Sequence, residues 1–167
     1  VLVVDAGTST AALNAADTLT ATTGTLYVPN TGTLRVVSTG SHGMTTGDLV
    51  KIKQGALTFT CAQDSDATEH AYPRATDPVF NKWVQATVIN ATTFDINVGV
   101  TTTGDYDHTF VSGTVDGILK ANSVLNFVDD SLTFTCSRDN NTRQKSYPRF
   151  TDPFSNQFVG VEAVAGD

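Results

Sequence analysis

The feature that most constrains this chain is an internal repeat with an offset of 75 residues. Residues 57–88 align without gaps on residues 132–163, with 14 identities in 32 positions. The shared strings are Leu-Thr-Phe-Thr-Cys and Tyr-Pro-Arg-x-Thr-Asp-Pro, which begin at Leu57 and Tyr72 in the first copy. Self-similarity at a fixed period is the signature of tandem modules, so the chain is expected to contain two related units.

The period also sets the expected domain boundaries. A unit of 75 residues is a usual size for a small β-sandwich or barrel. We expect an N-terminal segment at residues 1–30, a first β module at residues 31–100 and a second, truncated β module at residues 101–167. The strand-like tail of the first copy, residues 91–98, has no counterpart in the second, so that module is expected to lack its last strand.

The N-terminal segment contains a candidate donor strand. Residues 21–28 resemble residues 91–98, because both begin with Ala-Thr-Thr and continue with alternating apolar positions. An unpaired sheet edge invites the addition of a strand. We therefore expect residues 20–30 to complete the second module, within the same chain or from a neighbouring subunit. The chain begins at Val1 without an initiator Met or a signal-peptide pattern, which indicates a processed or partial product.

The local pattern predicts an all-β protein. Apolar and polar residues alternate over short stretches, the period of half-buried strands, and Gly and Asp turns separate them. The clearest alternating sets are Leu34 and Val36; Val50 and Ile52; Leu57, Phe59 and Cys61; Phe94, Ile96 and Val98; and Leu132, Phe134 and Cys136. We expect β-sandwich or barrel-like modules in tandem, with at most one short N-terminal helix at residues 10–19, capped by Ser9 or Thr10.

Charge and hydropathy exclude two classes of partner. The formal net charge is −7, and the chain has only ten Lys and Arg residues, too few for the basic patch that nucleic-acid binding needs. No apolar run approaches the roughly 20 residues that a membrane-spanning helix requires. We therefore expect no nucleic-acid partner and no membrane span.

The two cysteines occupy the same place in the two copies. Cys61 and Cys136 each lie at the inward phase of a Leu-x-Phe-x-Cys strand, so they are expected one module apart. A disulfide needs Cα atoms within about 7 Å. We expect free thiols that behave as small buried hydrophobes.

An acidic loop follows the first Leu-Thr-Phe-Thr-Cys strand. Asp64 and Asp66 lie two residues apart, as in the opening of a calcium-binding loop. In the second copy Asn141 replaces Asp66 and Lys145 replaces His70, which leaves few charged ligands. A solvated turn is the favoured interpretation, with a calcium site as the alternative. No metal ligand or cofactor is therefore assigned.

The Tyr72-Pro-Arg74-x-Thr-Asp77-Pro string is the most specific feature of the chain. An Arg side chain can hold a carboxylate with two parallel hydrogen bonds, and Asp77 or Asp64 could accept them. The favoured role is structural, with the Tyr ring packed on proline. A ligand-binding role is the alternative, because functional residues concentrate on such loops.

No set of residues in the sequence points to catalysis. His42, His70 and His108 do not recur at the equivalent positions of the second copy, and no nucleophile, metal-ligand or phosphate-binding motif is found. We expect a protein that is not an enzyme, with no catalytic, cofactor-binding or metal-binding residues.

The repeated strings resemble those of virion structural proteins of marine cyanobacterial phages. The resemblance lies in Leu-Thr-Phe-Thr-Cys, the polar loop and Tyr-Pro-Arg-x-Thr-Asp-Pro, and it extends to residues 39–48 and 106–111. It implies a non-catalytic fibre, tail-associated or capsid-decoration component of the phage particle. The partners it implies are further copies of the chain or other virion proteins, and the location is the virion.

Two other classes of protein share this sequence pattern. A carbohydrate- or cell-surface-binding adhesin module would place exposed aromatic side chains near Trp83, Tyr27 or Tyr106 and would bind a host-surface glycan outside the cell. A subunit of a secreted bacterial filament would use the same strand chemistry. Thr-rich strands suit all three classes and do not choose between them.

Overall fold

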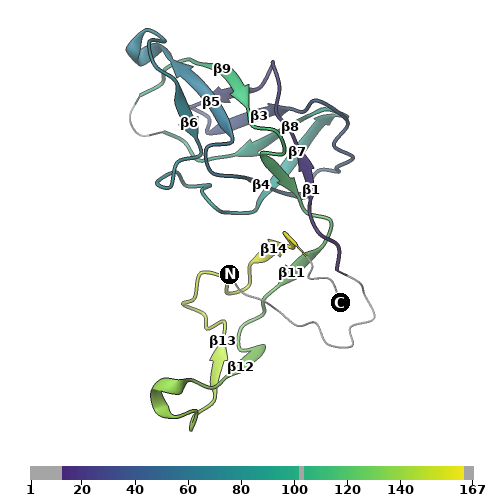
Figure 1. The fold of residues 1–167 in the computed structure, drawn as a ribbon, viewed down its shortest axis with the longest axis vertical. Coiled ribbons are helices and arrows are strands. Elements are labelled where there is room, and N and C mark those ends of the chain that lie inside the picture. The colour runs from purple at the N-terminus through teal and green to yellow at the C-terminus, as the bar shows by residue number, and fades with distance from the viewer. Residues whose placement is uncertain (1–12, 102–103, 164–167) are drawn as a thin grey trace.

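The computed structural model describes residues 13–101 and 104–163 and confirms the all-β prediction (Figure 1). Its regular elements are short strands and two single-turn 3-10 helices. The strands are β1 (Asp17–Leu19), β2 (Leu26–Val28), β3 (Thr33–Val37), β4 (Leu49–Ile52), β5 (Leu57–Cys61), β6 (His70–Tyr72), β7 (Val84–Asn90), β8 (Thr93–Asn97), β9 (His108–Gly113), β10 (Ile118–Lys120), β11 (Val124–Asn126), β12 (Leu132–Phe134), β13 (Lys145–Tyr147) and β14 (Phe158–Gly160). The 3-10 helices are η1 (Ala62–Asp64) and η2 (Ser137–Asp139).

The first repeat lies in a body made of two antiparallel sheets. One sheet has seven strands in the order β1-β10-β4-β7-β8-β3-β2, and the other has three in the order β6-β5-β9. Both sheets contribute to one hydrophobic core, which places this body among the sandwich-like β folds. The fully buried side chains at its centre include Leu34, Val36, Val50, Leu57, Phe94 and Ile118.

The alternation read from the sequence explains this core. Along β5, Leu57, Phe59 and Cys61 are buried while the threonines between them are partly exposed. In β3 the residues Leu34 and Val36 are likewise buried. Successive side chains of a strand point to opposite faces, so each strand sends one apolar row inward.

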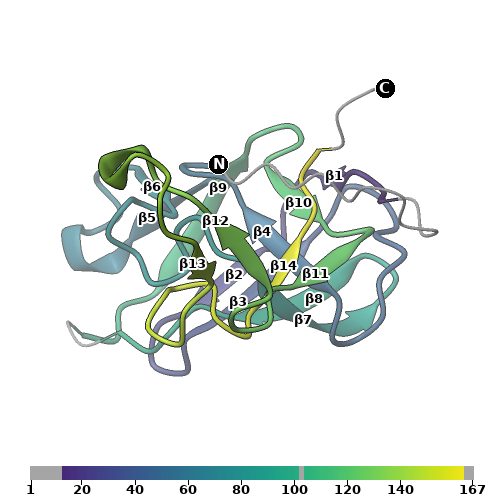
Figure 2. The same ribbon diagram turned by 90° about the horizontal axis from the view of Figure 1, so that it is seen from below.

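The second repeat forms two separate two-stranded sheets beyond one end of this body (Figure 1), and a view from that end draws them in front of it (Figure 2). β12 pairs with β13 in the register Leu132 opposite Tyr147, and β5 pairs with β6 in the equivalent register. β11 pairs with β14 in the same register as β4 with β7: Val124 lies opposite Gly160, and its equivalent Leu49 lies opposite Gln85. The sequence repeat is therefore also a repeat of strand pairing.

Two strands after the expected boundary at residue 101 pair with the first repeat. β9 pairs with β5, and β10 pairs with β4. Ile118 of β10 is fully buried in the first-repeat core. Residues 108–120 thus close the body that precedes them, which differs from the expected division at 100 and 101.

The N-terminal predictions differ from the structure in two places. Residues 13–16 are not helical, and Asp17–Leu19 form β1, which pairs with β10, so the predicted helix is wrong there; its first residues, 10–12, lie outside the described part of the chain. Pairing with β10 outweighs the weak helical propensity of this Ala-rich stretch. The expected donor strand β2 pairs with β3 rather than with the second repeat.

Candidate functional site

Each Tyr-Pro-Arg-x-Thr-Asp-Pro string folds into a turn held by its own Arg and Asp. The Asp77 carboxylate accepts hydrogen bonds from the Arg74 backbone N–H at 2.7 Å and from the Arg74 Nη2 at 3.0 Å. In the second repeat, Asp152 accepts the same two bonds from Arg149 at 2.8 and 3.0 Å. Of the two carboxylates that the sequence offered for Arg74, the structure selects Asp77.

These ion pairs shift the titration of their members. The hydrogen bond from Arg149 holds the pKa of the Asp152 carboxyl below its ordinary value. Asp152 in turn raises the pKa of the Arg149 guanidinium, and Asp77 raises that of Arg74. Because both guanidinium groups are largely solvent-exposed, the pairs shape the turn more than they stabilise the fold.

In the first repeat an aromatic cluster covers this turn and the adjoining β5–β6 hairpin. Tyr27 of β2 stacks on Tyr72, with ring centroids 5.8 Å apart. Phe110 of β9 meets Phe59 of β5 edge-on at 5.7 Å, and His108 meets Tyr27 at 4.9 Å. Burial under this cluster raises the pKa of the Tyr72 phenol. The cluster therefore depends on β2 and β9, which both lie outside the β5–β6 hairpin.

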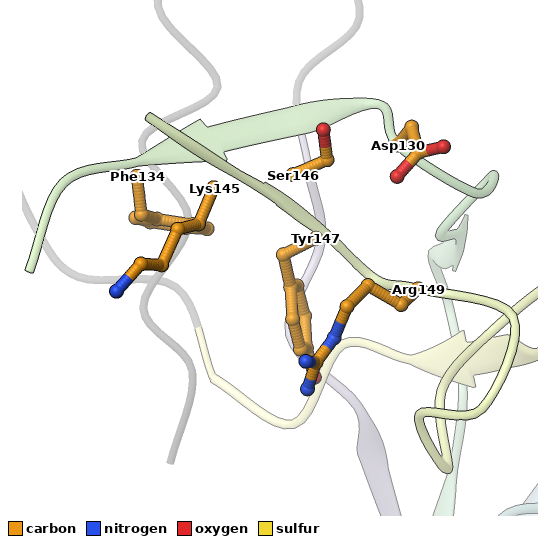
Figure 3. Close-up of a pocket in the computed structure, with 6 residues that line it drawn as sticks. All are labelled: Asp130, Phe134, Lys145, Ser146, Tyr147 and Arg149. Carbon is orange, nitrogen blue, oxygen red and sulfur yellow. The ribbon is translucent and has the colours of Figure 1, made fainter. Parts of the chain in front are cut away.

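In the second repeat the equivalent surface is open. It forms a hollow of about 540 Å³ (Figure 3) lined by Asp130, Phe134, Lys145, Ser146, Tyr147 and Arg149. Lys145, Tyr147 and Arg149 come from one extended segment and project to the same side of it. Phe134 and Tyr147 meet edge-on at 6.1 Å. Within the described residues, no strand equivalent to β2 or β9 covers them.

Exposure measures the difference between the two repeats. Phe59 is 3% exposed, whereas Phe134, its equivalent at an offset of 75, is 48% exposed. The second repeat as a whole exposes several large apolar side chains: Val124, Val128, Phe134, Phe150, Phe154 and Phe158. Among these, Phe134 lines the hollow together with Tyr147, and exposed apolar side chains that lie together are typical of interaction surfaces.

The acidic loop of the first repeat is a turn closed by internal hydrogen bonds. The Asp64 carboxylate accepts a hydrogen bond from the Thr68 hydroxyl, which is the main cause of its lowered pKa. Asp66 accepts a hydrogen bond from the Thr60 hydroxyl at 2.7 Å. In residues 13–101 and 104–163, no group of three or more His, Cys, Asp or Glu side chains is arranged to hold a metal ion.

The cysteines and histidines occupy separate positions. Cys61 and Cys136 are both free thiols; Cys61 is buried as expected, whereas Cys136 is only half-buried and follows the end of β12. His42 is a buried structural residue: its Nδ1 accepts from the Met44 backbone N–H at 3.0 Å, and its Nε2 donates to the Asn90 carbonyl at 2.8 Å. His70 lies near Asp64, and His108 belongs to the aromatic cluster.

The aromatic residues named for an adhesin do not form one exposed cluster. Trp83 is half-buried, and a Cβ atom on Gly160 of β14 would lie 2.7 Å from its ring. Tyr27 is half-buried in the aromatic cluster, and Tyr106 is exposed. Trp83 of the first repeat therefore lies against β14 of the second.

Comparison of the chain with protein-family models, curated proteins and solved structures gives no match to any of them. None of the helices in the described part of the chain has the length and apolar character needed to cross a bilayer. The most informative relationship is therefore internal. The sequence missed the open hollow, because a repeated motif predicts a repeated hairpin but does not say which strands cover it.

Proposed function

We propose that this chain is a non-enzymatic structural protein of a phage particle, a fibre, tail-associated or capsid-decoration component that assembles through its β modules. One observation carries the proposal. The second repeat reproduces the strand registers of the first, and among residues 13–101 and 104–163 nothing covers its apolar face at Phe134. Open strand edges and apolar faces are the surfaces through which β modules join one another. The assignment to a phage particle is supported by the sequence resemblance.

Assembly is tested by measuring the mass of the purified chain in solution by light scattering, with electron microscopy of the same sample. Oligomers or ordered particles are expected. Replacement of Phe134 and Phe158 together by Ser should shift the mass towards the monomer, because both side chains are exposed on the second repeat. The control is Phe150→Ser, on the turn. A wild-type chain that stays monomeric at all concentrations would refute assembly.

The place of the protein is tested separately from its assembly. Antibodies raised against the chain should label intact particles of marine cyanobacterial phages in immunogold electron microscopy. Labelling of the host cell surface or of secreted filaments instead would refute the virion assignment and would favour the extracellular alternatives.

A glycan-binding adhesin is the second candidate, favoured by the chemistry of the hollow. Tyr147 and Phe134 offer aromatic surfaces, while Asp130 and Arg149 offer polar groups, a combination that suits sugars. Glycan-array binding that is lost in Tyr147→Ala and kept in Tyr106→Ala would support this function. Tyr106 is the matched control because it is exposed and does not line the hollow.

A further inference from the structure

The first repeat shows what covers the apolar face of a β5–β6 hairpin. β9 pairs antiparallel with the outer edge of β5, placing Phe110 opposite Phe59 and His108 opposite Cys61. β10 continues the same segment and pairs with β4, placing Ile118 opposite Ile52. One continuous stretch, residues 108–120, therefore supplies two strands and buries the first-repeat face.

The second repeat reproduces the accepting side of this interface. β12 and β11 are the equivalents of β5 and β4, and each has its inner neighbour in the same register. In the part of the chain that the structure describes, neither strand has a partner on its other edge. Phe134 and Val124 are exposed, whereas their first-repeat equivalents Phe59 and Leu49 are buried.

Charge distinguishes the accepting surfaces of the two repeats. Asp105 and Asp107 lie just before β9, and the Asp107 carbonyl accepts a hydrogen bond from the Ala62 N–H at the start of the acidic loop. That loop, residues 62–70, has three carboxylates and no Lys or Arg. Its equivalent, residues 137–145, has three cations and one carboxylate. An acidic strand start is therefore better matched by the second repeat than by the first.

We infer that the open edges of β12 and β11 bind a two-strand polypeptide segment of the β9–β10 type, supplied by another copy of the repeat. The incoming strand lies antiparallel to β12 with its Phe opposite Phe134 and its His opposite Cys136. Its acidic start lies beside the cationic loop at residues 137–145. The inference rests on the proposed function, because it names the partner through which the modules join.

In the described part of the chain, residues 108–120 are the segment of this type, and each copy already uses them to close its own first module. Ile118 is fully buried and Phe110 packs on Phe59, so withdrawing residues 108–120 from the first repeat would open that core. A free segment of this sequence type avoids that cost, and a synthetic peptide of residues 104–120 is the direct probe.

The experiment titrates this peptide, fluorescently labelled, into the full chain and follows anisotropy. Saturable binding with one peptide per chain is expected, together with slower hydrogen exchange at the β11 and β12 amides. Phe134→Asp in the chain, or Phe110→Ala in the peptide, should weaken binding by at least about tenfold. Phe150→Asp is the matched control, since Phe150 is 84% exposed and lies on the turn, and it should leave binding within about twofold.

Several results would overturn the inference. No saturable binding would do so, and so would binding that Phe134→Asp leaves unchanged, because the peptide would then be exchanging with β9 in the first repeat. Reversal of the charges of Asp105 and Asp107 in the peptide should weaken binding most at low salt, and unchanged binding would contradict the predicted register. If the chain forms oligomers but does not bind the peptide, this inference is wrong and the assembly proposal stands. If the chain binds the peptide but is strictly monomeric, the assembly proposal is wrong.

Discussion

Phe59 and Phe134 occupy the same position in the two repeats, yet their surroundings are opposite. Phe59 is 3% exposed and touches the rings of Tyr27, His108 and Phe110, whereas Phe134 is 48% exposed and touches only the ring of Tyr147 among the described aromatic contacts. The same local sequence therefore forms the same hairpin with and without a covering strand.

This pair gives a matched test of stability. Phe59→Ala should lower the free energy of unfolding by about 3–5 kcal/mol, because it removes a buried ring and leaves a cavity. Phe134→Ala should lower it by less than about 1 kcal/mol, since its ring is already half in water. Urea denaturation monitored by circular dichroism measures both, and equal losses would contradict the assigned burial.

Trp83 gives a spectroscopic test of how the repeats are joined. It is the only tryptophan, so intrinsic fluorescence reports on its contact with Gly160. Gly160→Ala places a Cβ 2.7 Å from the ring and should displace it, with a red-shifted emission and a loss of about 1–3 kcal/mol. Gly40→Ala is the control, because a Cβ there meets no atom within 4 Å, and its emission should not change. An unshifted Gly160→Ala spectrum would argue against this contact.

The turn motif predicts that Asp77 contributes more than Arg74. Asp77→Ala leaves the Arg74 backbone N–H without its 2.7 Å acceptor and should cost about 1–2 kcal/mol. Arg74→Ala removes an exposed guanidinium and should cost less than about 1 kcal/mol. Chemical denaturation of the two variants gives the comparison. Asp77→Ala removes both the backbone bond and the ion pair, whereas Arg74→Ala removes only the ion pair, so equal losses would show that the side-chain ion pair holds the turn.

The lowered pKa of Asp152 predicts acid sensitivity of the second turn. The carboxyl binds its proton less readily in the folded chain than in the unfolded chain, where its ordinary pKa of 3.8 applies. Its stabilising contribution is therefore present above pH 3.8 and is lost as the pH falls through the lowered value. Carboxyl NMR titration should show this, and Arg149→Ala should bring the pKa back towards its ordinary value. An unchanged pKa in that variant would mean that another group lowers it.

The sequence was sufficient for the hairpins and insufficient for their neighbours. Alternation placed Leu57, Phe59 and Cys61 on the buried face of β5, and the repeat placed the same hairpin at β12. Periodicity tells which face of a strand is apolar, but it does not tell which distant strand pairs with its edge. β9 pairs with β5 and β1 pairs with β10 over long distances in the sequence, so neither pairing was predicted.

From the sequence, the carboxylate that accepts from Arg74 could be narrowed to Asp77 or Asp64, because Arg readily holds a carboxylate with two hydrogen bonds, and the structure shows that it is Asp77. The hollow around Phe134 and Tyr147 could not be predicted in the same way. The hollow exists because no described strand covers the β12–β13 hairpin. A repeated string predicts the hairpin but carries no information on whether a distant strand covers it.

Residues 108–120 belong to the second unit by sequence but close the module that precedes them. The boundary between structural modules therefore lies further along the chain than the boundary between sequence units. A gene that gained or lost one unit of 75 residues would keep the junctions between neighbouring units and change only how many modules stand in line. A cut at the sequence boundary near residue 100 would instead remove β9 and β10 from a core that contains Ile118. Length could thus vary by whole units during evolution, while breakage at the same boundary would be selected against.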